Sequence, residues 1–225
     1  MPHILMVVTS NAALPGGGPT GLWLEELAAS YYVFADAGCV VEMGSPAGGA
    51  APIDPLSLQE PWLTAAGRRL LEDSVVTASL RKTRRLDSID ALTFDAIYLV
   101  GGAATAWDYP ADADLANIVT TLFINGRPVA GVCHGVLGLA GARDASGKPI
   151  VAGRKVTGIS NAEETLTGFD KIVPILPETR LRELGGLFQC AAPLESHVVA
   201  DSNVLTGQNP ASAGALAQAV LRQLN

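Results

Sequence analysis

The sequence predicts an α/β fold in which a mostly parallel sheet is doubly wound, with helices on both of its faces. Short continuous apolar runs alternate along the chain with longer segments whose apolar residues recur at helical spacing. Most of these runs are followed by glycine or proline, as expected where a buried strand ends. The alternation favours strand-helix-strand units and predicts a functional site beyond the carboxyl ends of the strands.

The first such unit covers the amino-terminal part of the chain. Residues 3–8, "HILMVV", form a short apolar run that is followed by a loop rich in glycine and proline. Residues 22–38 carry apolar side chains at helical spacing and stop at a glycine. Residues 39–46, "CVVEMGSP", then complete the unit as a second strand.

The middle of the chain holds an irregular region, a further strand and a further helix. Residues 47–62 are rich in proline, and residues 64–85 return to a helical pattern whose internal break the sequence does not locate. Residues 95–102 are predicted as a buried strand, and residues 113–126 as an amphipathic helix with a glycine stop. Residues 128–133, "PVAGVC", form the next strand.

The carboxyl-terminal part is predicted to end in a pair of strands and a helix. The strand pair lies around residues 197–207, and the helix covers residues 211–224. No internal repeat is visible, and 225 residues are enough to bury one sizeable core. We therefore expect a single domain over residues 1–225.

Charge and composition exclude several classes of partner. A formal net charge of -7 argues against nucleic acid, because that binding requires Lys and Arg to neutralise phosphates. The local basic cluster in residues 81–85 is read as the solvated face of a helix. No apolar run approaches the about 18 residues that span a bilayer. The amino terminus also lacks a signal-peptide pattern, so we expect a cytoplasmic protein without membrane contact.

The cysteines and histidines are scattered along the chain. There are three of each, and they form no C-x-x-C, H-x-H or H-x-x-x-H pair. Such spacing supports neither a disulfide framework nor a metal site built from neighbouring ligands. We therefore expect no metal and no other cofactor.

Cys133 stands out because it lies in the turn "GVCHG" between a strand and a run of small residues. The G-x-nucleophile-x-G form is typical of a strained turn that projects a nucleophile above a sheet. At the amino terminus of a helix, the unpaired N–H groups and the helix dipole favour a thiolate. The pattern thus predicts an exposed thiol with a lowered pKa. The alternative is a buried cysteine with an incidental histidine beside it.

Further motifs stand in a fixed order around this turn and resemble one known family. They are "TSN" and "GGPTGLWLEEL" at the start, "GG" and "WDYP" in the middle, and "VTG", "NAEET" and "LTGQNPASA" toward the end. The set resembles the ThiJ/PfpI superfamily, which is class I glutamine amidotransferase-like. Within it, the chain is most similar to the branch of chaperone-like heat-shock proteins and glyoxalase III enzymes. The resemblance implies a flavodoxin-like α/β sandwich that is usually a homodimer.

The resemblance also assigns the site residues. Cys133 matches the family nucleophile, His134 the adjacent histidine, and Glu26 a glutamate of the first long helix. Glu26 shares an apolar helix face with Leu22, four residues earlier, which supports an inward position. Glu164 matches the acidic residue that orients the histidine, although its neighbour Glu163 remains an alternative.

These residues imply an activity on small reactive aldehydes. The thiolate of Cys133 would add to a 2-oxoaldehyde such as methylglyoxal, and Glu26 and His134 would move protons through an enediol. The expected product is D-lactate, formed without glutathione or metal. Alternatives are a redox-responsive stress protein or holdase chaperone, and a cysteine peptidase, amidase or deglycase of the same superfamily.

The loop expected to face Cys133 departs from the family pattern. The branch commonly has Gly-His-Gly where this chain has Gly102, Ala103 and Ala104. The backbone of Gly102 or Ala103 could still donate to an oxyanion, but the pocket would be larger and less polar. This change predicts either weak glyoxalase activity or a bulkier substrate. Trp23 is a candidate for the pocket wall, with core packing as its alternative.

Overall fold

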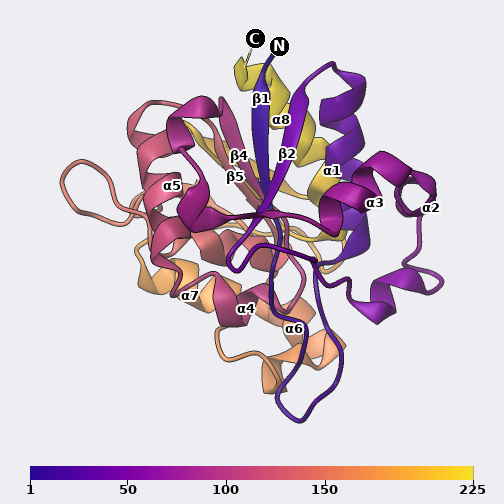
Figure 1. The fold of residues 1–225 in the computed structure, drawn as a ribbon. Helices are drawn as coiled ribbons and strands as arrows, with labels where there is room; N and C mark the ends of the chain where they lie inside the picture. Colours follow the sequence, from indigo (N-terminus) through magenta and orange to yellow (C-terminus); the bar gives the residue numbers. More distant parts are fainter. Residues whose placement is uncertain (225) are drawn as a thin grey trace.

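The computed structural model describes residues 1–224, and its centre is a seven-stranded sheet (Figure 1). The strand order is β3-β2-β1-β4-β5-β9-β8, and every neighbouring pair is parallel except β8 with β9. The strands are β1 (His3–Val7), β2 (Val40–Ser45), β3 (Arg84–Arg85), β4 (Ala96–Leu99), β5 (Val129–Val132), β8 (Val198–Asp201) and β9 (Val204–Gly207). The predicted doubly wound α/β fold, with its mostly parallel sheet, is confirmed.

Helices cover both faces of this sheet. The α-helices are α1 (Leu24–Asp36), α2 (Ala65–Glu72), α3 (Ser74–Leu80), α4 (Thr105–Asp108), α5 (Ala113–Ile124), α6 (Asn161–Thr167), α7 (Pro177–Glu183) and α8 (Ala213–Leu224). Short 3-10 helices are η1 (Pro55–Leu58), η2 (Leu86–Ser88), η3 (Ala91–Thr93), η4 (Cys133–Leu139), η5 (Phe169–Lys171) and η6 (Pro210–Ser212). A separate pair of short strands, β6 (Lys155–Val156) and β7 (Leu187–Phe188), is parallel.

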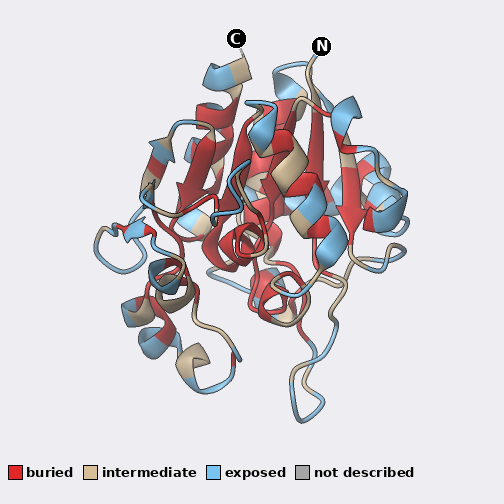
Figure 2. Cartoon of the chain, turned by 90° about the vertical axis from the view of Figure 1, so that its left-hand side faces the viewer, coloured by how far each residue is buried: buried red, intermediate tan, exposed pale blue. Residues whose placement is uncertain are grey.

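Alternate residues of the central strands form two separate cores. In β1, Ile4 and Met6 pack with α1 and α8, whereas Leu5 and Val7 pack with α5 on the opposite face. All residues of β4 and β5 are buried, which explains why their sequences read as continuous apolar runs. Figure 2 shows the consequence, with buried residues filling the sheet and the helix surfaces that face it.

The region 64–85 contains the break that the sequence did not locate. It lies at Asp73, whose side chain accepts hydrogen bonds from the backbone N–H groups of Val75 and Val76 and so begins α3. Arg84 and Arg85 were expected on a helix, but they form β3 at the edge of the sheet. Pairing with β2 makes these two residues a strand. Because β2 is distant in the sequence, a segment of two residues shows no local pattern that would predict the pairing.

Several short elements gather at the carboxyl ends of the parallel strands. Figure 1 shows the loop after β1, together with α4 and α6, on this side of the sheet. The segment after Cys133 was expected to be an α-helix, but it forms the 3-10 helix η4. None of the helices formed by residues 1–224 has the length and apolar character to span a membrane.

Candidate active site

Cys133 lies at the carboxyl end of β5 in a left-handed backbone conformation with φ of 56°. A residue with a side chain rarely adopts this conformation, and the surrounding structure must hold it there. Gly135 permits the tight approach of the chain, because a Cβ at this position would lie 2.3 Å from the carbonyl oxygen of Leu99. The strained turn predicted from "GVCHG" is therefore present.

His134 connects the thiol to a buried carboxyl group. Its Nδ1 lies 3.4 Å from Sγ of Cys133, and its Nε2 lies 2.7 Å from Oε1 of Glu164. Glu164 belongs to α6, whose start is fixed by a capping box between Ser160 and Glu163. His134 and Glu164 are both buried, so water does not weaken their interaction.

The ambiguity between Glu163 and Glu164 is resolved by the way α6 directs neighbouring side chains. Glu163 accepts hydrogen bonds from Ser160, Gln208 and Asn209. It also accepts the backbone N–H of Leu194. These bonds tie three separate segments together, which makes Glu163 a structural residue and leaves Glu164 as the partner of His134.

Glu26 approaches Cys133 from α1 on the other side. It is fully buried, and its Oε2 accepts the backbone N–H of Gly101 at 2.8 Å. Burial raises the pKa of Glu26 to about 8, although hydrogen bonds from Cys133 and Gly101 oppose the rise. A Cβ on Gly101 would lie 2.4 Å from Oε2, so only glycine leaves room for this contact. The inward position predicted for Glu26 is confirmed.

The prediction of an exposed, acidic thiol is wrong. Cys133 is only 4% exposed, and burial raises the pKa of its thiol well above the usual value, with the charge of Glu26 adding to the effect. The hydrogen bond from the backbone of His134 acts in the opposite direction but is the weakest of these influences. Desolvation therefore outweighs the favourable end of the short helix η4, and the resting side chain is a neutral thiol.

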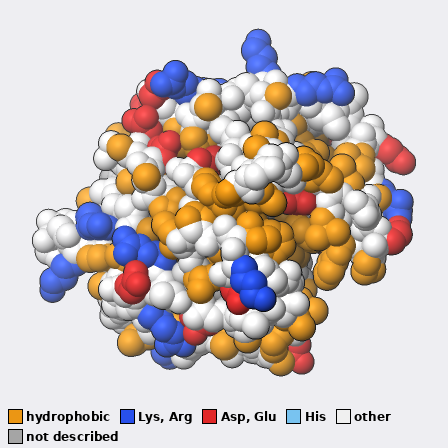
Figure 3. Space-filling view, turned by 90° about the horizontal axis from the view of Figure 1, so that it is seen from below, with side chains coloured by type: hydrophobic (Ala, Val, Ile, Leu, Met, Phe, Trp, Pro, Cys, Tyr) orange, Lys and Arg blue, Asp and Glu red, His pale blue; other side chains and the backbone are white. Residues whose placement is uncertain are grey.

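The thiol opens into a cavity of about 280 Å³. Figure 3 shows the face on which the strands end, where hydrophobic side chains gather across the middle and Lys and Arg lie mainly toward the edges. The cavity is lined by Trp23, Glu26, Asp54, Leu56, Trp62, Gly102, Ala103, Cys133, His134, Ile159, Glu163, Thr167, Phe169, Leu194, Asn209 and Pro210. The residues predicted to bind substrate or an oxyanion, namely Trp23, Gly102 and Ala103, thus all border it.

Comparison with known proteins identifies the family. Residues 20–223 match the DJ-1/PfpI family. The chain belongs to this family. The resemblance to the ThiJ/PfpI superfamily seen in the sequence motifs is therefore confirmed.

Several relatives of this DJ-1/PfpI chain are glyoxalases by name. Glyoxalase 3 of Candida albicans is 25% identical over 231 residues, which cover 98% of both chains. The glutathione-independent glyoxalase HSP31 of Saccharomyces cerevisiae is 27% identical and covers 93% of this chain and 92% of its own. Among solved structures, the Rapid Encystment Protein 24 KDa of Francisella tularensis has a TM-score of 0.95 at 33% identity, covering 100% of both chains.

Part of the cavity wall in this DJ-1/PfpI chain was not predicted from the sequence. Leu56 and Trp62 come from the proline-rich segment before α2, and Phe169 and Leu194 come from segments beyond α6. The presence of large apolar residues in an otherwise irregular segment was the available signal, since such residues need a surface to cover. Trp107 is not among the lining residues and packs against an apolar cluster that includes Leu137.

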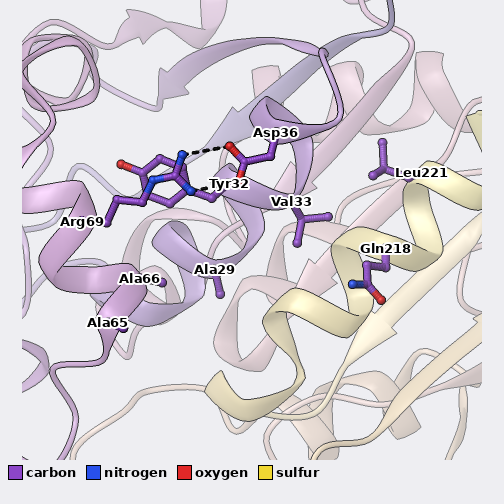
Figure 4. Close-up of a pocket in the computed structure, with 9 residues that line it drawn as sticks. All are labelled: Ala29, Tyr32, Val33, Asp36, Ala65, Ala66, Arg69, Gln218 and Leu221. Carbon is purple, nitrogen blue, oxygen red and sulfur yellow. Dashed lines mark hydrogen bonds and ion pairs between the residues drawn. The ribbon is translucent and has the colours of Figure 1, made fainter.

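A second, more open depression lies between α1, α2 and α8 (Figure 4). The guanidinium of Arg69 forms an ion pair with Asp36 at 2.8 Å and covers the ring of Tyr32 at 3.5 Å. None of the residues that line this depression also lines the Cys133 cavity. The reactive groups described above are therefore confined to the cavity at the ends of the strands.

Proposed function

We propose that this chain is a glutathione-independent glyoxalase, a lyase that converts 2-oxoaldehydes such as methylglyoxal to 2-hydroxy acids such as D-lactate. The observation that carries the proposal is the buried series of Glu26, Cys133, His134 and Glu164, which places a carboxyl group and an imidazole on the same thiol. The names of the Candida and Saccharomyces relatives support the same activity.

The first step is addition of Cys133 to the aldehyde. Sγ forms a bond to the aldehyde carbon, the thiol proton passes to Nδ1 of His134, and the imidazolium then gives this proton to the aldehyde oxygen to form a hemithioacetal. Glu164, at 2.7 Å from Nε2, stabilises the positive charge that the imidazole acquires during this transfer. A neutral resting thiol requires such a base, because the thiolate is not present beforehand.

The second step moves a proton between neighbouring carbons. A base removes the proton from the hemithioacetal carbon to give an enediol, and the same proton is returned to the adjacent carbon to give a thioester. Glu26 suits this exchange because its pKa of about 8 lies near neutral pH, where a carboxyl group can both accept and donate a proton. The backbone N–H groups at His134 and at Gly102 or Ala103 would stabilise the enediolate oxygen.

The last step is hydrolysis of the thioester by water. The carbon–sulfur bond breaks, the hydroxy acid leaves, and Cys133 regains its proton. One water is added overall, and no external oxidant or reductant is needed because the redox change is internal to the substrate. Cys133 takes the part that a free thiol would otherwise play, so neither glutathione nor any other cofactor is required.

The test is formation of D-lactate from methylglyoxal in the absence of glutathione. Cys133→Ala should abolish the reaction, and Glu26→Ala should lower it at least a hundredfold. Cys190→Ala, at an exposed position, serves as the matched control and should retain wild-type turnover. Equal turnover by all four proteins would disprove the proposal.

We further propose that the chain acts as a single domain over residues 1–225, as a homodimer and in the cytoplasm. The family resemblance supports the dimer, and size-exclusion chromatography with light scattering would measure it. Elution as a monomer at micromolar concentration would contradict this part of the proposal and leave the glyoxalase assignment intact.

A further inference from the structure

The Cys133 cavity combines a small reactive centre with a wall that is mostly apolar. The reactive side chains are Cys133, His134 and Glu26, whereas the rest of the wall comes from Trp23 and from five other segments of the chain. Its apolar members are Trp23, Leu56, Trp62, Ala103, Ile159, Phe169, Leu194 and Pro210. A volume of about 280 Å³ lies just below the ~300–1,000 Å³ typical of pockets that hold drug-sized ligands. The single methyl group of methylglyoxal would leave most of this wall in contact with water.

Two indole rings form part of the wall. The rings of Trp23 and Trp62 meet edge to face, with centroids 5.6 Å apart and an interplanar angle of 74°. Trp23 lies three residues before Glu26, so it is carried by the same chain segment as the reactive carboxyl. An aromatic substituent on the substrate could pack against these rings at the spacing that aromatic groups prefer.

Backbone contacts hold the two tryptophans in fixed positions. Leu22 donates its N–H to the carbonyl of Pro52 at 2.9 Å and accepts the N–H of Asp54 at 2.9 Å. Thr64, which begins α2, donates its hydroxyl to Glu25 on α1. The segment that carries Trp62 is therefore attached to Leu22, just before α1, on one side of the tryptophan and to α1 itself on the other, so the wall is preformed rather than assembled by the ligand.

The small residues Gly102 and Ala103 leave room for a bulky group. Ala103 follows Gly102 and borders the cavity with only a methyl group. Because Ala103 is buried, a larger side chain at this position would take up space inside the protein rather than turn outward into solvent.

The charged residues of the wall disfavour an anionic substrate. The acidic residues among those that line the cavity are Glu26, Asp54 and Glu163, and no Lys or Arg is among the lining residues. Asp54 already accepts hydrogen bonds from Thr20 and from the backbone of Leu56. A substrate carboxylate brought into this space would meet the acidic residues Asp54 and Glu163 and no compensating Lys or Arg.

We infer that the preferred substrates are uncharged 2-oxoaldehydes with a bulky apolar substituent, above all arylglyoxals, and that Trp23 and Trp62 select them. The inference rests on the proposed glyoxalase function and specifies its substrate class. Binding energy from the remote aryl group is available to the transition state as well as to the bound substrate, so it raises kcat/KM. The hydrophobic gain from covering such a wall supports at least a tenfold preference.

The first experiment compares phenylglyoxal with methylglyoxal for the wild-type protein. We expect kcat/KM to be at least tenfold higher for phenylglyoxal, and at least tenfold lower for 4-carboxyphenylglyoxal than for the neutral 4-methylphenylglyoxal. If methylglyoxal is turned over at an equal or higher kcat/KM, the inference is overturned while the proposed function stands. If no 2-oxoaldehyde is turned over, the proposed function itself fails.

The second experiment removes intrinsic differences in aldehyde reactivity by comparing variants. Trp62→Ala should lower the ratio of kcat/KM for phenylglyoxal to kcat/KM for methylglyoxal at least fivefold, and Trp62→Phe should keep most of this ratio. Leu58→Ala, on the same segment but outside the cavity lining, is the control and should leave the ratio unchanged. Thermal unfolding verifies that each variant is folded. A Trp62→Ala ratio equal to that of wild type, in a folded protein, would overturn the role of this wall.

Discussion

Nε2 of His134 lies 2.7 Å from Oε1 of Glu164, and both side chains are buried. A carboxyl group in this position favours a proton on Nε2 and thereby leaves Nδ1 free to receive the proton of Cys133. The contact thus sets the direction of proton transfer at the thiol, although Glu164 itself does not touch the sulfur.

Replacement of Glu164 tests this positioning role. Glu164→Gln should lower kcat about 10- to 100-fold with little change in KM, because the amide no longer stabilises the imidazolium. The exposed Glu183→Gln on α7 is the control and should behave as wild type. Steady-state kinetics with methylglyoxal across pH 6 to 9 would measure both, and an unchanged kcat for Glu164→Gln would contradict the assignment.

The raised pKa of Glu26 predicts a pH-dependent contribution to stability. Burial raises its pKa from the ordinary 4.5 to about 8 in the folded protein, so the folded state binds the proton more tightly. The stability from this group is fully present below pH 4.5 and is lost as the pH rises toward 8. Glu26→Gln removes the titration, so the variant should gain stability relative to wild type over that interval.

The size of this effect follows from the interval itself. At about 1.36 kcal/mol per pKa unit, the change from 4.5 to about 8 corresponds to at most about 5 kcal/mol. Urea unfolding of the wild type and of Glu26→Gln at pH 5, 6, 7 and 8 would measure this effect. The other titrating groups contribute equally to both proteins, so they cancel in the difference between the two free energies of unfolding. A difference that stays constant over this range would show that Glu26 is not buried as a neutral acid.

The burial of Cys133 predicts slow reaction with general thiol reagents. A neutral, 4% exposed thiol should react with iodoacetamide at pH 7 far more slowly than the exposed Cys190. Mass spectrometry of tryptic peptides after brief labelling would compare the two sites, with Cys190→Ser identifying the fast one. Preferential labelling or peroxide oxidation of Cys133 would instead favour the redox-responsive alternative.

The close approach at Gly101 predicts a strongly destabilising substitution. In Gly101→Ala the new Cβ would lie 2.4 Å from Oε2 of Glu26 and 2.6 Å from the carbonyl oxygen of Val132. We expect a loss of about 2–4 kcal/mol in the free energy of unfolding, together with reduced activity. Gly18→Ala, whose Cβ would meet only a side-chain atom at 3.8 Å, should change stability by less than about 0.5 kcal/mol.

Local pattern was sufficient for the elements in the centre of the fold. The strands β1, β4 and β5 were predicted because strands buried on both faces need unbroken apolar runs. The helix that carries Glu26 was predicted from its spacing, and its register placed this residue inward. The edge strand β3 was missed because its two arginines adopt a strand conformation through pairing with β2, and their own sequence carries no strand pattern.

The sequence by itself determined the strained turn at Cys133, the adjacent histidine and the acidic residues available to them. Only the tertiary structure decided that Glu164, rather than Glu163, meets His134. It also decided that the thiol is buried with a raised pKa, and that aromatic residues line the cavity into which the thiol opens. The physical reason is that desolvation, charge interaction and cavity shape depend on segments that are far apart in the chain. A local sequence motif does not indicate which of these segments pack against it.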